Sequence, residues 1–258
     1  MSTWPAGHRG LRALSTRETA RVLKLWTQTV LAPILSSALF VVVFGLSLGD
    51  RIREIDGFPY EQYIVPGLIA MSMAQAAYAN NSSSVFQARF DRYINDVLAS
   101  PMRGWEINLG LNLGGAVRAL LIGAGLMAIA VPLTGVPVRD PLVLVAALAL
   151  LLAIFCSFGV VVGVYAESWD QSAFVTNLVI LPLSFFGGVF YSVGRLPSPW
   201  QEVSHANPLY YLIDAVRHGF LGQSDVPVGI SLAVGAVLAA ACVAWSCWLF
   251  ATGRRLKP

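Results

Sequence analysis

The sequence predicts an all-α integral membrane protein with six transmembrane helices. Of its 258 residues, 56% are hydrophobic and only 12% are charged, against roughly 25% charged in a typical soluble domain. The mean hydropathy is +0.66. The apolar residues gather in long runs, and a run of ~20 apolar residues is what a helix needs to cross a bilayer. The whole chain, 1–258, is therefore expected to form one membrane domain.

The six predicted spans follow one another with short connections. Their ranges are 30–48, 63–85, 109–131, 142–165, 174–191 and 228–250. Prolines punctuate the connection between the third and fourth spans. The residues before the first span are basic and interrupted, and that span has no small-residue cleavage site at its end, so we expect it to be retained.

The basic residues predict the orientation of the spans. Of seventeen Lys and Arg residues, eleven lie on the side of the two termini: Arg9, Arg12, Arg17, Arg21, Lys24, Arg89, Arg92, Arg103, Arg254, Arg255 and Lys257. Five lie on the other side: Arg51, Arg53, Arg139, Arg195 and Arg217. Positive residues favour the cytoplasm, so both termini are expected there.

An amphipathic helix is predicted at 9–27, before the first span. Its apolar residues, such as Leu11, Leu14 and Val22, share one face, and its basic residues lie mostly elsewhere. Such a helix is expected to lie in the inner interface of the membrane. Glu18 falls on the apolar face. Two interpretations are open for it: a side chain that snorkels to water, or a contact with a cytoplasmic partner.

Few other residues inside the spans carry a chemical signal. Gly110 with Gly114, and Gly159 with Gly163, form GxxxG pairs that predict close helix packing and are compatible with a dimer. Arg118 lies within the third span. It is expected either to snorkel or pair structurally, or to contact a substrate on its pathway.

The sequence contains no motif for catalysis or nucleotide binding. Lys24 and Lys257 are the only lysines, and neither belongs to a GxxxxGK[ST] loop. HExxH does not occur, and the one GxSxG match, Gly45 to Gly49, lies in an apolar run rather than on the strand-to-helix turn that a nucleophilic serine needs, so we expect no catalytic residues and no metal site. If the chain transports something, the energy is expected to come from a partner.

The loop at 86–105 is the predicted place to receive that energy. Phe86, Phe90, Ile94 and Val97 recur at helical spacing among polar residues, until Ser100-Pro101 stops the helix. A short amphipathic helix of this kind either fits a groove on another protein or lies in the interface.

The segment 192–222, between the fifth and sixth spans, predicts a pair of short helices. It follows a span that ends in aromatics and two glycines, and it contains Asn207-Pro208 and Arg217. Its second half is too short and too polar to cross a bilayer. At membrane depth it must be helical or packed on protein, which predicts re-entrant half-helices.

Three motifs resemble the permease subunits of ABC-2 type transporters. They are R-x-x-N-x-x-L-x-S-P from Arg92 to Pro101, the end of the fifth span, and N-P-L-Y-Y-x-x-x-x-x-R from Asn207 to Arg217. Further stretches, such as Q-Y-I-V-P-G-L-I at 62–69 and G-G-V-F-Y-S at 187–192, resemble a YadH-like branch of bacterial inner-membrane permeases. The resemblance covers essentially the whole chain in the same order.

The resemblance implies the ABC-2 (type V exporter) permease fold and half of an exporter. Two copies of the permease would associate with two copies of a separate ATP-binding subunit, which would hold the ATP and Mg, so that this chain binds no cofactor. The segment 9–27 would be the connecting helix, 86–105 the coupling loop and 192–222 the external gate. Family substrates include drugs, lipids and polysaccharides, so the resemblance does not fix this one.

The candidate residues follow from these assignments. Those expected to couple to the ATPase are Glu18, Phe90, Arg92, Ile94, Asn95, Asp96 and Pro101. Those expected at the pathway or gate are Arg118, Asn177, Phe185, Phe186, Gly187, Gly188, Phe190, Tyr191, Pro208 and Arg217. The alternative function is an ion-coupled secondary transporter or an integral-membrane enzyme.

Overall fold

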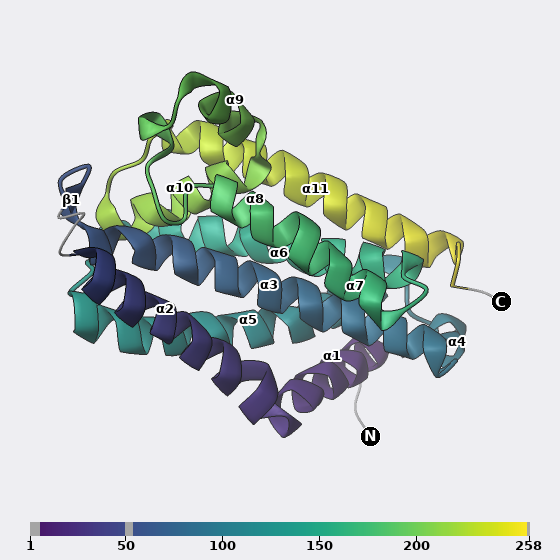
Figure 1. The fold of residues 1–258 in the computed structure, drawn as a ribbon. Coiled ribbons are helices and arrows are strands. Elements are labelled where there is room, and N and C mark those ends of the chain that lie inside the picture. Colours follow the sequence, from purple (N-terminus) through teal and green to yellow (C-terminus); the bar gives the residue numbers. More distant parts are fainter. Residues whose placement is uncertain (1–5, 50–53, 257–258) are drawn as a thin grey trace.

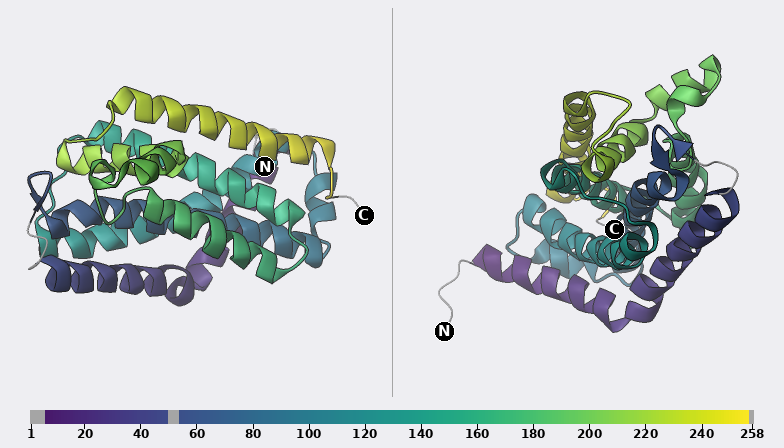
Figure 2. Two further views of the ribbon diagram at one scale, coloured as in Figure 1. Left: turned by 45° about the horizontal axis from the view of Figure 1, so that its top comes forward. Right: turned by 90° about the vertical axis from the view of Figure 1, so that its left-hand side faces the viewer.

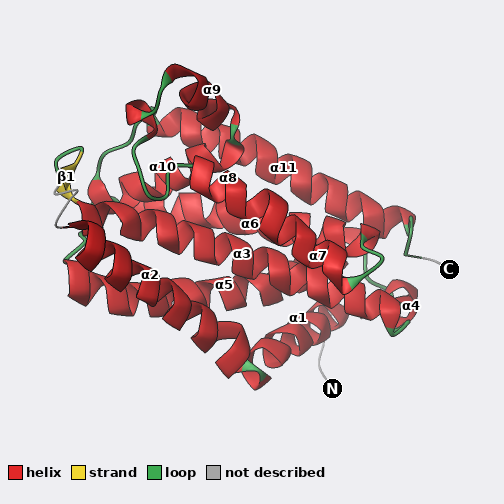
Figure 3. Cartoon of the chain, viewed as in Figure 1, coloured by secondary structure: helices red, strands yellow, loops and turns green. Residues whose placement is uncertain are grey.

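A computed structural model describes residues 6–49 and 54–256, which are almost entirely helical (Figure 3). The α-helices are α1 Ala6–Lys24, α2 Ala32–Gly49, α3 Tyr60–Phe90, α4 Ile94–Ala99, α5 Gly104–Thr134, α6 Pro141–Tyr165, α7 Trp169–Val175, α8 Leu181–Phe186, α9 Ser198–Ala206, α10 Pro208–Leu221 and α11 Val228–Thr252. The π-helical segments are η1 Thr27–Leu31 and η2 Thr176–Ile180, and η3 Val193–Arg195 is a 3-10 turn. The strands are β1 Glu54–Ile55 and β2 Phe58–Pro59.

The long helices lie side by side in a bundle (Figures 1 and 2). One end, called here the α4 end, holds α4 and the C-terminal end of α11. The opposite end, called the hairpin end, holds the hairpin β1–β2. The turn of that hairpin consists of Asp56 and Gly57, with φ of 51° and 82°. Two left-handed residues are what a tight two-residue hairpin requires.

Helix α3 is the centre of the bundle. It packs against α2, α5, α6 and α10, and most of its side chains are buried. At 1.5 Å per residue its 31 residues extend about 46 Å, more than the ~30 Å of a hydrocarbon core. Because protein surrounds it, α3 can carry polar side chains in its middle that a lipid-facing helix could not.

Both GxxxG pairs make contacts within this chain. A Cβ at Gly159 would lie 2.5 Å from the Tyr78 carbonyl oxygen, and one at Gly163 would lie 2.7 Å from that of Ser82, both on α3. Gly114 approaches Glu18 of α1 in the same way, at 2.5 Å. The prediction of close helix packing is confirmed, but these glycine faces are occupied by neighbouring helices of the same chain and are not free for a second copy.

Four helical stretches in the described part of the chain are long and apolar enough to cross a membrane. They are Thr27–Gly45, Gly104–Thr134, Pro141–Tyr165 and Val228–Thr252. They coincide with the predicted first, third, fourth and sixth spans. The second predicted span lies in the more polar α3, and the fifth lies in the run from α7 through η2 to α8, which the π-helical segment interrupts.

Candidate functional site

The α4 end exposes an aromatic side chain at a break in the chain. Helix α3 ends at Phe90, and α4 begins only at Ile94. Between them, Arg92 has a left-handed backbone with φ of 63°. The continuous helix expected through this loop is therefore wrong, because the chain reverses direction at this point. Phe90 is left 74% exposed, whereas Ile94 is buried.

Two further aromatic rings support Phe90. The ring of Phe86 stacks on it with centroids 6.2 Å apart, and meets Trp169 of α7 edge-on at 4.6 Å. Trp169 is itself half exposed. We call Phe90 and Trp169, with Phe86 beneath them, the aromatic patch. It joins the end of α3 to the start of α7, two segments that are distant in the sequence.

A groove of about 740 Å³ separates α1 from α4. Basic side chains of α1 (Arg17, Arg21 and Lys24) and Asp96 of α4 are among the residues that line it. The guanidinium of Arg17 lies 4.9 Å from the centre of the Tyr93 ring, just before α4. The amphipathic helix and the loop after α3 are thus brought together, as neighbours across an open groove whose charged lining residues are three basic and two acidic.

The carboxylate of Glu18 is buried and fully paired. Glu18 is 2% exposed. Its two oxygens lie 2.8 Å from Arg17 and 3.1 Å from Arg21, and one of them accepts a hydrogen bond from Ser84 of α3 at 2.7 Å. Neither interpretation of Glu18 describes this arrangement, because the side chain neither snorkels to water nor presents itself to a partner. It fixes α1 to α3.

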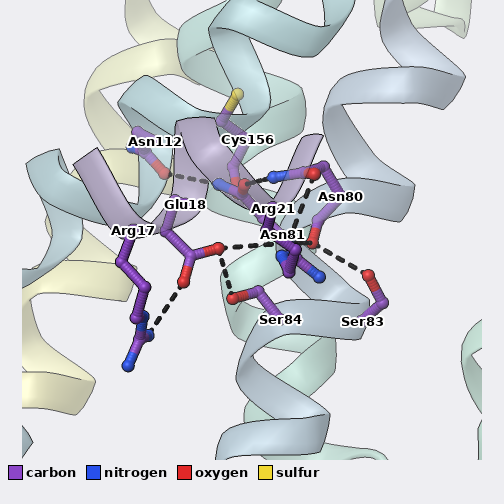
Figure 4. A network of polar contacts seen from close by, with 9 residues as sticks. All are labelled: Arg17, Glu18, Arg21, Asn80, Asn81, Ser83, Ser84, Asn112 and Cys156. Atoms are coloured by element: carbon purple, nitrogen blue, oxygen red, sulfur yellow. Dashed lines mark hydrogen bonds and ion pairs between the residues drawn. The ribbon is translucent and has the colours of Figure 1, made fainter. Parts of the chain in front are cut away.

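From Glu18 a polar network continues across three further helices (Figure 4). Arg21 donates to both the backbone and the side-chain oxygen of Asn80, each at 3.2 Å. The amide of Asn80 donates to Asn81, and that of Asn81 donates to Asn112 of α5 and to the carbonyl of Cys156 of α6. A buried network whose members are hydrogen-bonded holds its helices in one relative position.

Arg118 lies close to this network but does not join it. Its Nε donates to the backbone carbonyl of Thr29 in η1 at 3.0 Å. The side chain is half-buried and lines a cavity of about 430 Å³ between α2, α3 and α5. Within the described chain, no carboxylate lies within ion-pair distance of Arg118.

At the hairpin end, the buried Arg217 of α10 ties three elements together. Its guanidinium donates to the carbonyl of Gly188, just after α8, and lies 4.1 Å from the centre of the Tyr63 ring of α3. Gly188 has φ of 78°, a conformation that favours glycine. A Cβ at Gly67 of α3 would lie 2.9 Å from the Cα of Val189. The chain after α8 is thus held directly against α3.

The other gate candidates form an aromatic layer around this contact. Phe185 stacks on Phe190 at 5.4 Å, and Phe190 meets Phe44 of α2 at 5.1 Å. Phe186 stacks on Trp200 of α9 at 5.7 Å. Tyr191 is half-buried after this layer. These rings come from α2, α8 and α9, so they join the predicted gate to the bundle.

Two short helices follow, and they differ in their surroundings. Helix α10 packs among α3, α6 and α11, whereas α9 lies at the edge of the bundle (Figure 1). Asn207 separates them: its side chain accepts from the Leu209 amide at 3.0 Å, which caps α10, and donates to the Leu183 carbonyl of α8 at 2.6 Å. Pro208 takes the first position of α10, where its missing N–H costs nothing.

A comparison of the sequence with known families identifies this arrangement. The model of the ABC-2 type transporter family matches residues 9–221. The chain belongs to the ABC-2 type transporter family. It is 37% identical over 249 residues to the inner membrane transport permease YadH of Escherichia coli K12, with 96% of each chain covered. It is 29% identical over 238 residues to nodulation protein J of Rhizobium meliloti, with 90% of each covered.

For this ABC-2 permease, family membership implies a transport function and association with an ATP-binding subunit. The chain is a membrane protein, similar over nearly its whole length to an inner-membrane permease.

The structure separates the residues predicted to couple to the ATPase into two groups. Phe90, Arg92, Asn95, Asp96 and Pro101 are exposed at the α4 end. Ile94 and Glu18 are buried within the chain, so neither offers a surface to a partner. Ile94 packs with Leu14, Val85 and Leu249, because the break after Phe90 turns it inward. The prediction that Phe90, Ile94 and Val97 share one exposed apolar side is therefore wrong.

The pathway candidates are divided as well. Phe185 packs on Phe190, Phe186 packs on Trp200 of α9, and Arg217 binds the Gly188 carbonyl between them in sequence, while Arg118 lines a separate cavity. Asn177 is exposed in η2. Its neighbour Thr176 lines the cavity of Arg118.

Sequence reasoning missed Trp169 and the asparagine network. A signal existed for both. Trp169 lies in the short polar connection between two apolar runs, where an aromatic side chain has no core to join. The five residues at 80–84 are all Asn or Ser within a predicted span, and such a run at membrane depth requires partners.

Proposed function

We propose that this ABC-2 permease is the transmembrane subunit of an ATP-driven exporter. Two copies of it, with two copies of an ATP-binding subunit, would form the working assembly, and the ATP and Mg would reside on that subunit. The single observation that carries the proposal is the family match over residues 9–221. The geometry adds a feature for each task that such a subunit has: an exposed patch at one end, a cavity in the middle and a closed aromatic layer at the other end.

The proposed topology has six crossings with both termini in the cytoplasm. Helix α3 and the run from α7 to α8 lie alongside the four apolar helices (Figure 1). Eleven of the seventeen basic residues lie on the side of the termini, which supports assigning the α4 end to the cytoplasm.

Energy from the partner would enter through the aromatic patch. Phe90 is exposed to 74% beside the exposed polar side chains of Arg92, Asn95 and Asp96. An exposed aromatic ring with a polar rim is the usual composition of an interface centre. The groove between α1 and α4 would flank this contact, and Pro101 would end the coupling segment. From there the network of Glu18, Arg21 and Asn80 offers a mechanical connection into the spans.

The layer of Phe185, Phe186, Phe190 and Tyr191 would close the pathway toward the outside. Arg217 would hold it shut through the Gly188 carbonyl, with α9 and α10 as the paired half-helices and Pro208 at the hinge between them. Asn177 would face the pathway on the inner side of this layer.

The proposal is tested by expressing the chain with its candidate ATP-binding subunit in one membrane. The complex is expected to co-purify, and ATP hydrolysis is expected only when the ATP-binding subunit is present, since the permease has no phosphate-binding loop. Hydrolysis by the purified permease alone, or transport driven by an ion gradient without ATP, would instead favour the enzyme or the secondary carrier.

A further inference from the structure

The cavity that contains Arg118 is lined by both polar and apolar side chains. Its polar residues include, besides Arg118, Gln75 and the serines Ser37 and Ser72, whose hydroxyls bond to each other at 2.7 Å. Its apolar residues include Phe40 and Met71. A cavity of about 430 Å³ with a few polar groups and an apolar remainder has the form of a small-molecule site.

The charge of Arg118 is not neutralised within the described chain. Its hydrogen bond to Thr29 uses Nε, whereas a guanidinium carries five donors. Arg21, a half-buried cation of the network, is paired with Glu18. Arg217 has the Gly188 carbonyl and the Tyr63 ring. Arg118 differs from both because it keeps free donors and lines an open space.

Depth makes this difference significant. Arg118 follows Gly114, which packs on Glu18 of α1, by one helical turn of α5. It therefore lies just inside the bundle from the amphipathic helix. An arginine within a membrane-spanning helix is costly when it is unpaired, and such residues are usually paired or functional. An anionic group from outside the chain would supply the missing partner.

The other polar side chains of the cavity are suited to the same ligand. The side-chain amide of Gln75 has no hydrogen-bond partner among the described residues, although it lines the cavity near the two serines. An oxygen-rich anionic group could accept from Gln75 and from the guanidinium together, because charge-assisted hydrogen bonds to arginine favour carboxylate or phosphate. The apolar part attached to that group would then lie along Phe40 and Met71.

We propose that this cavity binds the acidic head group of an amphiphilic cargo, with Arg118 as its counter-ion. The cargo class is an anionic amphiphile, with a carboxylate or phosphate on a lipid-like chain. The inference rests on the proposed transport function, because it names what the transporter would recognise.

Binding is measured on the purified full-length permease without its partner, with two fluorescent probes. One is an undecanoic acid with a dansyl group at the far end, and the other has the same chain and label with a trimethylammonium head. The variants are Arg118→Gln, Arg118→Lys and Ser36→Trp, which places a ring into the cavity from an exposed lining position. Arg139→Gln is the control, since Arg139 is exposed and stacks on Phe58 at the hairpin end.

We expect the acid to bind about tenfold or more tightly than the ammonium probe. Arg118→Gln should remove that preference, Arg118→Lys should keep most of it, and Arg139→Gln should leave it unchanged. Ser36→Trp should weaken both probes while the charge remains. Equal binding of the two probes by the wild type, or a preference that survives Arg118→Gln, would overturn the proposal. If Arg118→Gln does not fold, unchanged acid binding by Ser36→Trp overturns it equally.

A second arm separates cargo from a resident anionic lipid. The complex with the ATP-binding subunit is placed in phosphatidylcholine discs that hold no anionic lipid, and the acid probe is added. Stimulated ATP hydrolysis that depends on Arg118 identifies cargo. Binding that depends on Arg118 without stimulation, in a complex that hydrolyses ATP, assigns the site to a resident lipid and overturns the cargo inference. Because probe binding is measured without the partner, a failure of the complex to assemble would count only against the proposed function.

Discussion

Ser84 of α3 donates a hydrogen bond of 2.7 Å to the buried carboxylate of Glu18 on α1. This contact joins the amphipathic helix α1 to α3, the central helix of the bundle. In the sequence the two helices are separated by the whole of α2. Gly114 makes it possible, because any larger residue there would meet the Cβ of Glu18. The hydrogen bond and the close approach at Gly114 together hold α1 directly against its neighbours α3 and α5.

Glu18→Gln is expected to destabilise the permease. The amide can still accept from Ser84, but Arg17 and Arg21 lose their shared counter-charge. Hydrogen bonds to a charged group contribute about 1.5–3 kcal/mol, and less where the partners are part-exposed, as these arginines are. The readout is the melting temperature of the detergent-purified protein. Glu202→Gln, on the exposed side of α9, is the control and should change little. Equal melting temperatures of Glu18→Gln and the wild type would show that the ion pairs of Glu18 make no net contribution to stability.

Gly159→Ala should loosen the packing of α3 on α6. The new Cβ would lie 2.5 Å from the Tyr78 carbonyl oxygen, a backbone atom that cannot move away by a rotamer change. Overpacking of this kind typically costs about 1–3 kcal/mol. Gly229→Ala is the matched control, because no atom lies within 4 Å of its Cβ position in α11. The melting temperature should fall clearly in Gly159→Ala and should fall much less, or rise, in Gly229→Ala. Two identical curves would contradict the close approach.

Phe90→Ala is expected to weaken assembly with the ATP-binding subunit while leaving the permease folded. The ring is mostly exposed, so its removal opens no cavity in the chain. Truncation of an aromatic anchor at an interface costs ~2 kcal/mol or more. Co-purification yield and ATP hydrolysis of the complex are the measurements. Ile94→Ala should behave differently, lowering permease stability itself because Ile94 is buried. Leu142→Ala, exposed at the start of α6, should change neither. If Phe90→Ala matches the wild type in both assays, the patch is not the docking site.

Arg217→Lys should destabilise the hairpin end more than a surface change does. Lysine cannot both donate to the Gly188 carbonyl with a planar fork and stack on the Tyr63 ring, so it should restore little of what arginine provides. Arg195→Lys is the control, since its ion pair with Asp56 is exposed and such pairs contribute about 0–1 kcal/mol. Limited proteolysis between α8 and α10 reports the opening of this segment. Equal rates of proteolytic cleavage in both variants would show that Arg217 does not hold this segment closed.

The orientation is tested with single cysteines at Asn95 and Asp56, both exposed and at opposite ends of the bundle. The half-buried native Cys242 and Cys247 are first replaced by serine. An impermeant thiol reagent applied to whole cells should label the Asp56 position directly, and the Asn95 position only after permeabilisation. Labelling of Asn95 in intact cells would reverse the proposed topology.

The apolar runs predicted the four most hydrophobic spans because lipid-facing helices must be apolar on most of their surface. The placement of Ile94 could not be predicted in this way. The spacing between Phe90 and Ile94 fits one face of a continuous helix. The left-handed backbone at Arg92 ends that helix, so the two side chains no longer point the same way. Hydrophobic periodicity contains no signal for a left-handed residue. The role of Glu18 could not be predicted for another reason. Its partner Ser84 lies sixty-six positions away in the sequence, and a contact between distant helices produces no local sequence pattern. Arg118 was visible as a charge in a predicted span, but its cavity is lined mostly by residues of two other helices, α2 and α3, which the sequence does not place beside it.

The π-helical segment Thr176–Ile180 determines which way the side chains of the predicted fifth span point. A π-helical turn contains an extra residue relative to an α-helical one, and each residue of an α-helix turns the chain by about 100°. The side of α8 that bears Phe185 is therefore rotated from where the phase of α7 would put it. Deleting one residue from this segment would be expected to restore a regular helix and carry Phe185 away from Phe190, with every remaining side chain chemically unchanged. Here the number of residues, rather than their kind, decides which way the ring points.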